Sequence, residues 1–318
     1  MASFSRQVKD ELLDVRLRRD DDAKKLVQGA TLAAATLKFS RRARTWGLHY
    51  VSENEPLISF IAKLAQKNYS LESIVSLNEH ERLNARNTEL FLYGDGLDRL
   101  SEDSGLFTVD ENGERSYEPH MPEGLDTEHG FRAFLRGVFL MCGTVSDPEK
   151  GCHAEMVFKN EFAAKSIAEL MTKRNIPPKL SKRRNLFVVY IKNGDTVEDF
   201  LTFMGAGESM LVLSEHRMIR DIKNNSNREV NCFNANTEKT VQASGKQTED
   251  IELIISRLGY DAFDDDLYEL AMARLDYPEM SLTQLAERLG IGRSAANYRF
   301  KKIARIADRI RDNKDITE

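Results

Sequence analysis

The chain has 318 residues, of which 41% are hydrophobic and 31% are charged, and its formal net charge is −5. This composition is that of a globular protein with room for two or three domains. The negative net charge excludes nucleic-acid binding through overall charge alone, so any such role must depend on local basic patches. The first residues lack the apolar core of a signal peptide, and no apolar run approaches the roughly 20 residues that span a bilayer. We therefore expect a cytoplasmic protein that makes no membrane contact.

Two predicted helices are unusual because each has a glycine near its centre. The first, LVQGATLAAATL, surrounds Gly29, and an equivalent helix, FRAFLRGVFLMCG, surrounds Gly137. A glycine inside a helix costs about 1 kcal/mol relative to alanine, so both glycines require a structural reason. Close backbone approach of two helices is the natural reason, and we expect these two helices to pack against each other.

An internal repeat surrounds these helices. Residues 54–64 and 160–170 share the pattern Asn-Glu, five residues, Ile-Ala, one residue, Leu. Each copy follows a glycine-centred helix and precedes a β-rich segment and a Gly/Asp turn that opens another helix. Each unit is therefore predicted to be helix, two strands, helix, two strands, helix, with antiparallel strand pairs and the two sheets side by side. The predicted fold class is α+β, a duplicated αββαββα domain over 1–223, with repeats at about 1–100 and 126–223, followed by an all-α domain.

The remaining segments connect or follow the repeats. The polar segment 101–125 predicts a loop, and 211–223 predicts an amphipathic basic helix that packs on the repeat domain. Residues 224–250, rich in Asn, Thr and Ser, predict a linker that is helical in part near 240–247, and 251–318 predicts a helical DNA-binding domain. The stripe expected on the amphipathic helix comprises Arg217, Arg220 and Lys223 beside Met218, Ile219 and Ile222.

The C-terminal residues Ser281–Arg311 predict a helix-turn-helix. Ser281 is a good N-cap for the first helix, and Gly290 supplies the left-handed residue that ends it. A second helix begins near Gly292, and residues 288–311 carry eight basic side chains against one acid. This is the charge pattern of a helix whose first turns enter a major groove while its flanks meet phosphates. Its apolar face is predicted to comprise Ala296, Phe300, Ile303, Ala307 and Ile310.

Double-stranded DNA is therefore the predicted partner of the second helix. The side chains expected to contact it are Arg293, Ser294, Asn297, Tyr298, Lys301, Lys302 and Arg305. Strand-borne basic residues of the repeat domain are candidates for secondary DNA contacts, with plain surface charge as the open alternative. They are Lys38, Arg41, Arg42, Lys179, Lys182, Arg183 and Arg184.

Three stretches in this order make the chain resemble the WhiA family of bacterial DNA-binding regulators: FLRGVFLMCGTVSDPEKG (Phe134–Gly151), NNSNREVNCFNANTEKTV (Asn224–Val241) and the tail SLTQLAERLGIGRSAANYR. The glycine-centred helices are similar to the paired motifs of LAGLIDADG homing endonucleases. The resemblance implies a degenerate LAGLIDADG-like domain followed by a helix-turn-helix. It also implies a nucleoid-associated transcription regulator of cell division, chromosome segregation and, in spore formers, sporulation, with RNA polymerase or another regulator as a candidate partner.

A nuclease of this fold holds a divalent metal with an acidic residue at the eighth position of each motif helix. On this sequence those positions are Ala34 and Cys142, neither of which offers the oxygen ligand that Mg²⁺ requires. Asp147 lies just beyond the second motif, but the first motif has no matching acid. Without metal, phosphodiester cleavage loses its activated water. We therefore expect no enzyme activity, no catalytic residue, no metal, no cofactor and no small-molecule substrate.

Other chemistry finds little support in the sequence. The three cysteines have no paired metal-ligand spacing, and the six histidines are scattered. Three alternatives remain open: an active metal-dependent homing-type endonuclease, a protein-interaction module tethered to DNA by its tail, and an RNA-binding protein. The last is disfavoured because the aromatic residues are not interleaved with the basic ones as base-stacking platforms require.

Overall fold

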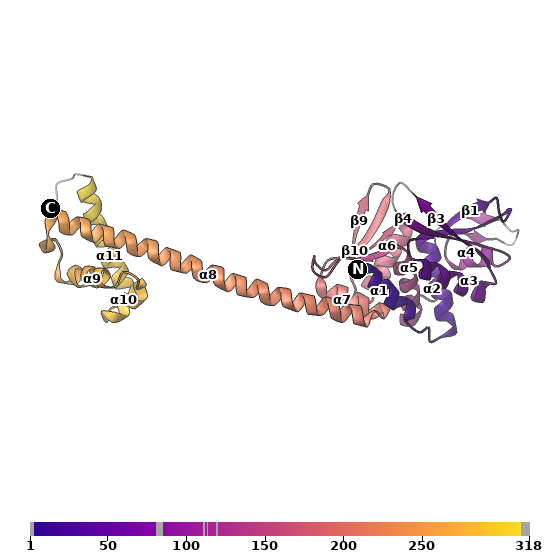
Figure 1. The fold of residues 1–318 in the computed structure, drawn as a ribbon, viewed down its shortest axis with the longest axis horizontal. Helices are drawn as coiled ribbons and strands as arrows, with labels where there is room; N and C mark the ends of the chain where they lie inside the picture. Colours follow the sequence, from indigo (N-terminus) through magenta and orange to yellow (C-terminus); the bar gives the residue numbers. More distant parts are fainter. Residues whose placement is uncertain (1–2, 81–84, 111, 113, 119, 313–318) are drawn as a thin grey trace. The chain divides into compact units, whose positions relative to one another are not determined.

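The chain forms two compact units, Met1–Arg220 and Asp221–Glu318 (Figure 1). The division lies close to residue 223, where the repeat domain was predicted to end. Within the part of the chain that the structure describes, no helix is long and apolar enough to cross a membrane. The computed structural model describes residues 3–80, 85–110, 112, 114–118 and 120–312.

The first unit contains two copies of the same order of elements, and the strands of each copy form a four-stranded antiparallel sheet. The first copy consists of α2 (Asp20–Ala34), β1 (Thr36–Ser40), β2 (Thr45–Ser52), α3 (Glu55–Tyr69), β3 (Glu72–His80), β4 (Ala85–Tyr93) and α4 (Leu97–Asp103). The second consists of α5 (Glu128–Cys142), β7 (Gly143–Val145), β8 (Ala154–Phe158), α6 (Glu161–Thr172), β9 (Lys179–Arg183), β10 (Leu186–Ile191) and α7 (Gly194–Met204).

The two sheets have equivalent strand orders, β1-β2-β4-β3 and β7-β8-β10-β9, and every adjacent pair within them is antiparallel. The central strands contribute buried side chains to the core, among them Leu90 and Leu92 of β4 and Val189 and Ile191 of β10. These residues join one hydrophobic core that both repeats share. The predicted α+β class, with a duplicated αββαββα domain, is confirmed.

Helices α2 and α5 pack against each other at the centre of this unit (Figure 1). A Cβ atom added at Gly29 would lie 2.1 Å from the carbonyl oxygen of Phe134, and one added at Gly137 would lie 1.9 Å from that of Leu26. Real Cβ atoms essentially never approach so closely, so each glycine lets the other helix's backbone into contact. The predicted reason for both glycines is confirmed.

The repeated Asn-Glu pair marks equivalent helix starts. The side-chain oxygen of Asn54 accepts from the backbone N–H of Leu57 at 3.1 Å, and that of Asn160 accepts from Phe162 at 2.9 Å. Each asparagine thus satisfies an amide that the first turn of its helix leaves unpaired. The sequence repeat therefore records the N-caps of α3 and α6.

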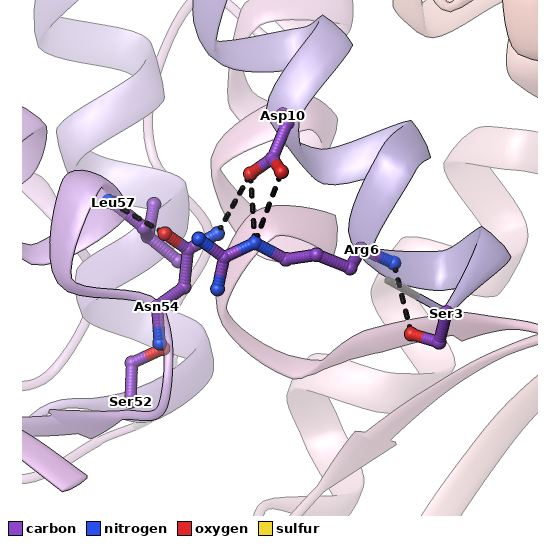
Figure 2. A network of polar contacts seen from close by, with 6 residues as sticks. All are labelled: Ser3, Arg6, Asp10, Ser52, Asn54 and Leu57. Atoms are coloured by element: carbon purple, nitrogen blue, oxygen red, sulfur yellow. Dashed lines mark hydrogen bonds and ion pairs between the residues drawn. The ribbon is translucent and has the colours of Figure 1, made fainter. Parts of the chain in front are cut away.

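A helix that was not predicted, α1 (Phe4–Asp14), precedes the first repeat and contacts it through polar side chains. Asn54 donates to Asp10 at 3.3 Å, and Asp10 also accepts from Arg6 of its own helix at 2.9 Å (Figure 2). Ser5 of α1 accepts from the backbone N–H of Val145 in the second repeat at 3.2 Å. Because α1 bonds to both repeats, it contributes to holding them together.

Two expectations about connecting segments are corrected. Residues 101–125 contain the end of α4 and a short two-stranded ladder, β5 (Thr108–Val109) with β6 (Arg115–Ser116). Residues 224–250 are not a weakly structured linker, because α8 (Gly207–Leu258) continues through them as one helix of 52 residues. Asparagine, serine and threonine cost less than 1 kcal/mol each in a helix, and the segment has no proline to break it. A composition typical of loops was therefore compatible with a helix.

The start of α8 is fixed to the first unit by charge as well as by apolar contact. The Glu11 carboxylate accepts from the backbone N–H groups of Glu208 and Ser209 at 2.8 and 2.9 Å. Arg217 forms ion pairs of 2.6 Å with Asp195 and with Glu198 of α7. Packing of this helix on the repeat domain is confirmed, and among the predicted side chains it uses Arg217 and Arg220, the latter donating to the carbonyl of Pro148. Those expected beside the arginines are exposed, namely Met218, Ile219 and Ile222.

The second unit is all-α and has its own hydrophobic core. Arg274, almost fully buried, donates to the carbonyl of Met280 at 2.6 Å and to the side chain of Gln247 at 2.9 Å, which joins three segments of the unit. The elements after α8 are the 3₁₀ turn η1 (Tyr260–Ala262), α9 (Asp265–Asp276), α10 (Leu282–Arg288) and α11 (Arg293–Arg311).

The contact between α2 and α5 predicts that adding one methyl group at either glycine strongly destabilises the first unit. Replacing Gly29 or Gly137 by alanine should lower the free energy of unfolding of the first unit by about 3 kcal/mol or more, because the helices must separate. Gly207→Ala is the matched control, since nothing lies within 4 Å of its added Cβ, and it should change stability by no more than about 1 kcal/mol. Urea unfolding followed by circular dichroism measures the difference, and equal stability of all three variants would contradict the helix contact.

Candidate nucleic-acid interface

The turn between α10 and α11 has the local features that the sequence predicts. The Ser281 hydroxyl accepts from the backbone N–H of Gln284, whose side chain in turn accepts from the Ser281 N–H at 2.8 Å. Gly290 has φ +68°, a left-handed conformation that glycine adopts without strain. The N–H of Ile291 then donates to the Ala286 carbonyl at 2.9 Å and closes the turn. These bonds fix where α11 begins.

Helix α11 has one buried and one exposed face. Four of its five predicted apolar residues, Ala296, Phe300, Ile303 and Ala307, are buried, and Ile310 is partly buried against the same core. The opposite face carries the predicted DNA-contacting side chains, all on the N-terminal two-thirds of the helix. Those that are exposed are Arg293, Ser294, Asn297, Tyr298, Lys301 and Arg305, and Lys302 is partly exposed.

The basic residues of this region fall into two groups. Arg299 and Arg311 form ion pairs with Asp266 of α9 at 2.9 Å and with Asp250 of α8 at 2.6 Å, so they hold α11 in place. Arg288 lies over the ring of Tyr277 and donates to its hydroxyl. The second group has no carboxylate partner among the residues that the structure describes and remains available for phosphates. It consists of Arg293, Lys301, Lys302, Arg305 and, nearer the end of the helix, Arg309.

A hollow of about 470 Å³ within the second unit extends this surface. Asn297 and Lys301 of α11 line it together with Lys239 and Lys246 of α8, and Phe300 forms part of its apolar wall. The two α8 lysines were missed because they fall in the segment taken for a linker. Their seven-residue spacing, about two helical turns, was the signal that could have placed them on one face.

The basic residues of the first unit are arranged differently from the prediction. Arg41 and Arg42 lie in the β1–β2 turn and Arg184 in the β9–β10 turn rather than on strands. In each turn one arginine, Arg44 or Arg184, adopts a left-handed backbone, with φ near +55°. The prediction used charge alone, whereas tight hairpins place their central residues outside the ladder. Lys38, Lys179, Lys182 and Arg183 do lie on strands.

These basic side chains also differ in their contacts. Arg183 pairs with Glu155 at 3.3 Å, which reduces its availability to a ligand. Lys38, Arg41 and Arg42 line a hollow of about 350 Å³ on the first sheet, which Glu89 also lines. A hydrogen bond from Asn78, with a smaller effect of His49, lowers the pKa of Glu89. This hollow therefore mixes charges of both signs, unlike the exposed face of α11.

The positions that would hold metal in a nuclease lie at the last residues of α2 and α5. They are Ala34 and Cys142. Burial raises the pKa of the Cys142 thiol to about 12, against the opposing charge of Lys9, so the thiol is protonated at neutral pH. Asp147 accepts from the backbone N–H of Glu149 at 3.0 Å within a turn. Across the described parts of the chain, no group of three or more His, Cys, Asp or Glu residues could hold a metal ion.

The exposed face of α11 predicts a separation of base and phosphate contacts. Asn297→Ala should weaken binding to the preferred duplex by about 1–3 kcal/mol and affect random DNA less, because an amide reads base edges. Arg305→Ala should weaken both duplexes alike and reduce the slope of log affinity against log salt by about 1. Fluorescence anisotropy at several salt concentrations measures both quantities.

The control for these variants is Arg228→Ala, which removes an exposed arginine of α8 that does not line the hollow. It should leave affinity and salt slope unchanged. Equal losses on preferred and random duplexes for Asn297→Ala would show that this side chain meets only the backbone.

Comparison with known proteins agrees with this architecture. The WhiA LAGLIDADG-like domain matches residues 131–223, and the WhiA C-terminal HTH domain matches residues 226–307. The probable cell division protein WhiA of Clostridium beijerinckii is 32% identical over 317 residues, covering 98% of this chain and 100% of the relative. That of Ruminiclostridium cellulolyticum is 34% identical over 319 residues, covering 98% and 99%.

A solved structure supports the fold over the full length. The crystal structure of full-length DUF199/WhiA from Thermatoga maritima matches with a TM-score of 0.59 at 22% identity, covering 97% of this chain and 99% of that one. A structure of the N-terminal LAGLIDADG domain of DUF199/WhiA matches with a TM-score of 0.50 at 18% identity, covering 64% and 91%. Given full-length relatives above 30% identity and a family domain matched in each unit, the chain belongs to the WhiA family.

Proposed function

We propose that this chain is a DNA-binding transcription regulator of bacterial cell division. The observation that carries the proposal is the exposed polar face of α11, where Arg293, Lys301 and Arg305 have no carboxylate partner among the described residues. Asn297 lies between them as a side chain able to form two hydrogen bonds with an adenine edge. A helix-turn-helix presents such a face to the major groove.

The names of relatives supply the biological process. The clostridial relatives are named probable cell division proteins, and we extend this role to the present chain. Chromosome segregation and, in spore formers, sporulation are the related processes that we include in the proposal. The protein then acts in the cytoplasm at the nucleoid. As a transcription regulator it requires RNA polymerase or another regulator as a protein partner.

The repeat domain has a supporting role in this proposal. Its hairpin turns, with Arg41, Arg42 and Arg184, and the strand residue Lys182 supply secondary contacts to the DNA backbone. Such contacts add affinity and salt dependence without sequence preference. Catalysis is not part of the proposal, because Ala34 and a protonated Cys142 stand where a metal would need carboxylates.

The function is tested in a cell whose chromosomal copy carries Arg293→Ala with Asn297→Ala. We expect loss of the protein from its preferred chromosomal sites, altered transcription of the adjacent genes and a changed distribution of cell length. Chromatin immunoprecipitation, transcript sequencing and microscopy measure these effects, with Arg228→Ala as the control at equal protein level. Normal division together with normal site occupancy in the double variant would refute the proposal.

The absence of catalysis is tested directly. Purified full-length protein should leave a supercoiled plasmid carrying a bound site uncut in Mg²⁺ or Mn²⁺, and chelator should not change its binding. Gel electrophoresis detects nicking at the level of single cuts. Specific cleavage that chelator abolishes would overturn this prediction, and its loss on Asp147→Ala would locate a relocated metal site.

A further inference from the structure

A cavity of about 480 Å³ lies in the first unit where the N-terminal ends of α2 and α5 meet the end of α7. Its wall is formed by the connection between α1 and α2, the N-terminal half of α5 as far as Arg136, and the last turn of α7 with the glycine that follows it. Five arginines line it, whereas Asp22 is the one acidic residue that does so among the described residues. The arginines are Arg16, Arg18, Arg19, Arg132 and Arg136.

Arg136 is the innermost of these arginines, with 5% of its surface exposed. Its Nε donates to the carbonyl of Met204 at 2.9 Å. Its two terminal nitrogens have no hydrogen-bond partner, and no carboxylate lies within ion-pair distance, among the residues that the structure describes. Burial lowers the pKa of Arg136, and the charge of Asp22 only opposes this effect from a distance. A largely buried guanidinium with no counter-charge close by is costly. Its terminal nitrogens, which are not among the buried atoms that lack a partner, are open to the cavity, which favours an anion there.

The other four arginines leave the cavity positively charged. Arg19 donates to a ring nitrogen of His129 at 2.8 Å, and Arg132 pairs with Glu128 on its outer side while its Nε has no partner. Arg16 and Arg18 are exposed, and their side chains form no ion pair with another described residue.

The acid within the cavity does not neutralise this charge. One oxygen of Asp22 accepts from the backbone N–H groups of Arg18 and Arg19, each at 3.1 Å, and the other is buried without a hydrogen-bond partner. Asp22 thus forms no hydrogen bond or ion pair with the guanidinium groups of the cavity, although its charge acts on Arg136 at longer range. The N-terminal ends of α2 and α5 add further partial positive charge.

The cavity is distant from the surfaces assigned to DNA in the first unit. The sheets begin at Thr36 and Gly143, directly after the C-terminal ends of α2 and α5. The cavity opens toward the opposite ends of these 15-residue helices, with Arg136 reaching it from the middle of α5, and a helix of this length extends about 22 Å. A duplex held by the β1–β2 and β9–β10 turns therefore does not supply the missing anion.

We propose that this cavity binds a small molecule that carries two or more linked phosphate groups, such as a nucleoside diphosphate or triphosphate. Guanidinium groups bind phosphate oxygens in pairs, and several of them around one site match a chain of phosphates better than a single one. A volume of about 480 Å³ lies within the range of small-molecule sites. The sequence predicted no small-molecule substrate, and the ligand proposed here is bound rather than converted. The proposal does not depend on the DNA-binding function.

The first test titrates the full-length protein with pyrophosphate, tripolyphosphate and GTP, with orthophosphate and guanosine as controls, by calorimetry and thermal unfolding. We expect one saturable site for at least one linked phosphate, binding at least tenfold tighter than orthophosphate, and no binding of guanosine. A hundredfold excess over Kd should raise the Tm of the first unit by about 5–10 °C. Tighter binding of GTP than of tripolyphosphate would identify a nucleotide, and the reverse order would identify an inorganic ligand. Absence of saturable binding by all three probes overturns the proposal.

The second test uses matched charge changes. Arg16→Gln with Arg18→Gln should weaken the tightest probe at least tenfold, while Arg41→Gln with Arg42→Gln, which removes the same charge from the sheet side, should not. Arg136→Met should abolish binding and Arg136→Lys should restore part of it. If Arg136→Met fails to fold, the Arg16/Arg18 pair decides the question. Equal weakening by both double variants, or displacement of the probe by a saturating short duplex, overturns the proposal.

Discussion

The backbone contact between α2 and α5 is the constraint on which the rest of the first unit depends. At Gly29 and Gly137, a backbone carbonyl of the other helix lies in the space that a Cβ atom would occupy. That closeness sets the position of each repeat relative to the other, because the first strand of each sheet, β1 or β7, follows directly from one of these helices. The shared core between the repeats then forms around the helix pair. Glycine at positions 29 and 137 lowers helix propensity, and the close packing of the two repeats that it permits offsets this cost.

The same helix pair separates two chemically different ends. At the C-terminal ends, Ala34 and Cys142 remove the carboxylates that a nuclease would place there, so no like-charge repulsion has to be offset by a metal. Toward the N-terminal ends, arginines from segments distant in sequence line one cavity together with Arg136. The first end leads into the sheets, and the second lies beside the start of α8. The two ends of the helix pair thus differ in character: apolar and thiol side chains at one end, and an arginine-lined cavity toward the other.

Much of this architecture follows from the sequence, and the exceptions have physical reasons. Glycine at a helix centre is a local signal that located the α2–α5 contact, and the repeated Asn-Glu pair marked the two equivalent units, although its role as an N-cap was seen only in the structure. The helical spacing of apolar residues in α11 likewise distinguished its buried face, with Phe300, from its exposed face. Residues 224–250 were predicted to be a linker because they are rich in asparagine. Asparagine has only a weak preference against helix, and a segment without proline can remain helical despite it. The arginine cavity was not predictable, because no local pattern shows that residues 16–19, 132–136 and 202–205 meet.

The basic residues of the second unit show why a charge count cannot identify a binding surface. Arg299 and Arg311 have the same charge as Arg293 and Arg305, yet their ion pairs with Asp266 and Asp250 direct them toward the body of the unit. Asp250 is buried, so the Arg311 pair satisfies a charge that would otherwise be costly there. These pairs fix the position of α11, so the arginines without a carboxylate partner project from a rigidly held helix. The net negative charge of the chain is therefore compatible with DNA binding. Some of the acidic residues, such as Asp250 and Asp266, hold α11 in position and leave its outer face basic.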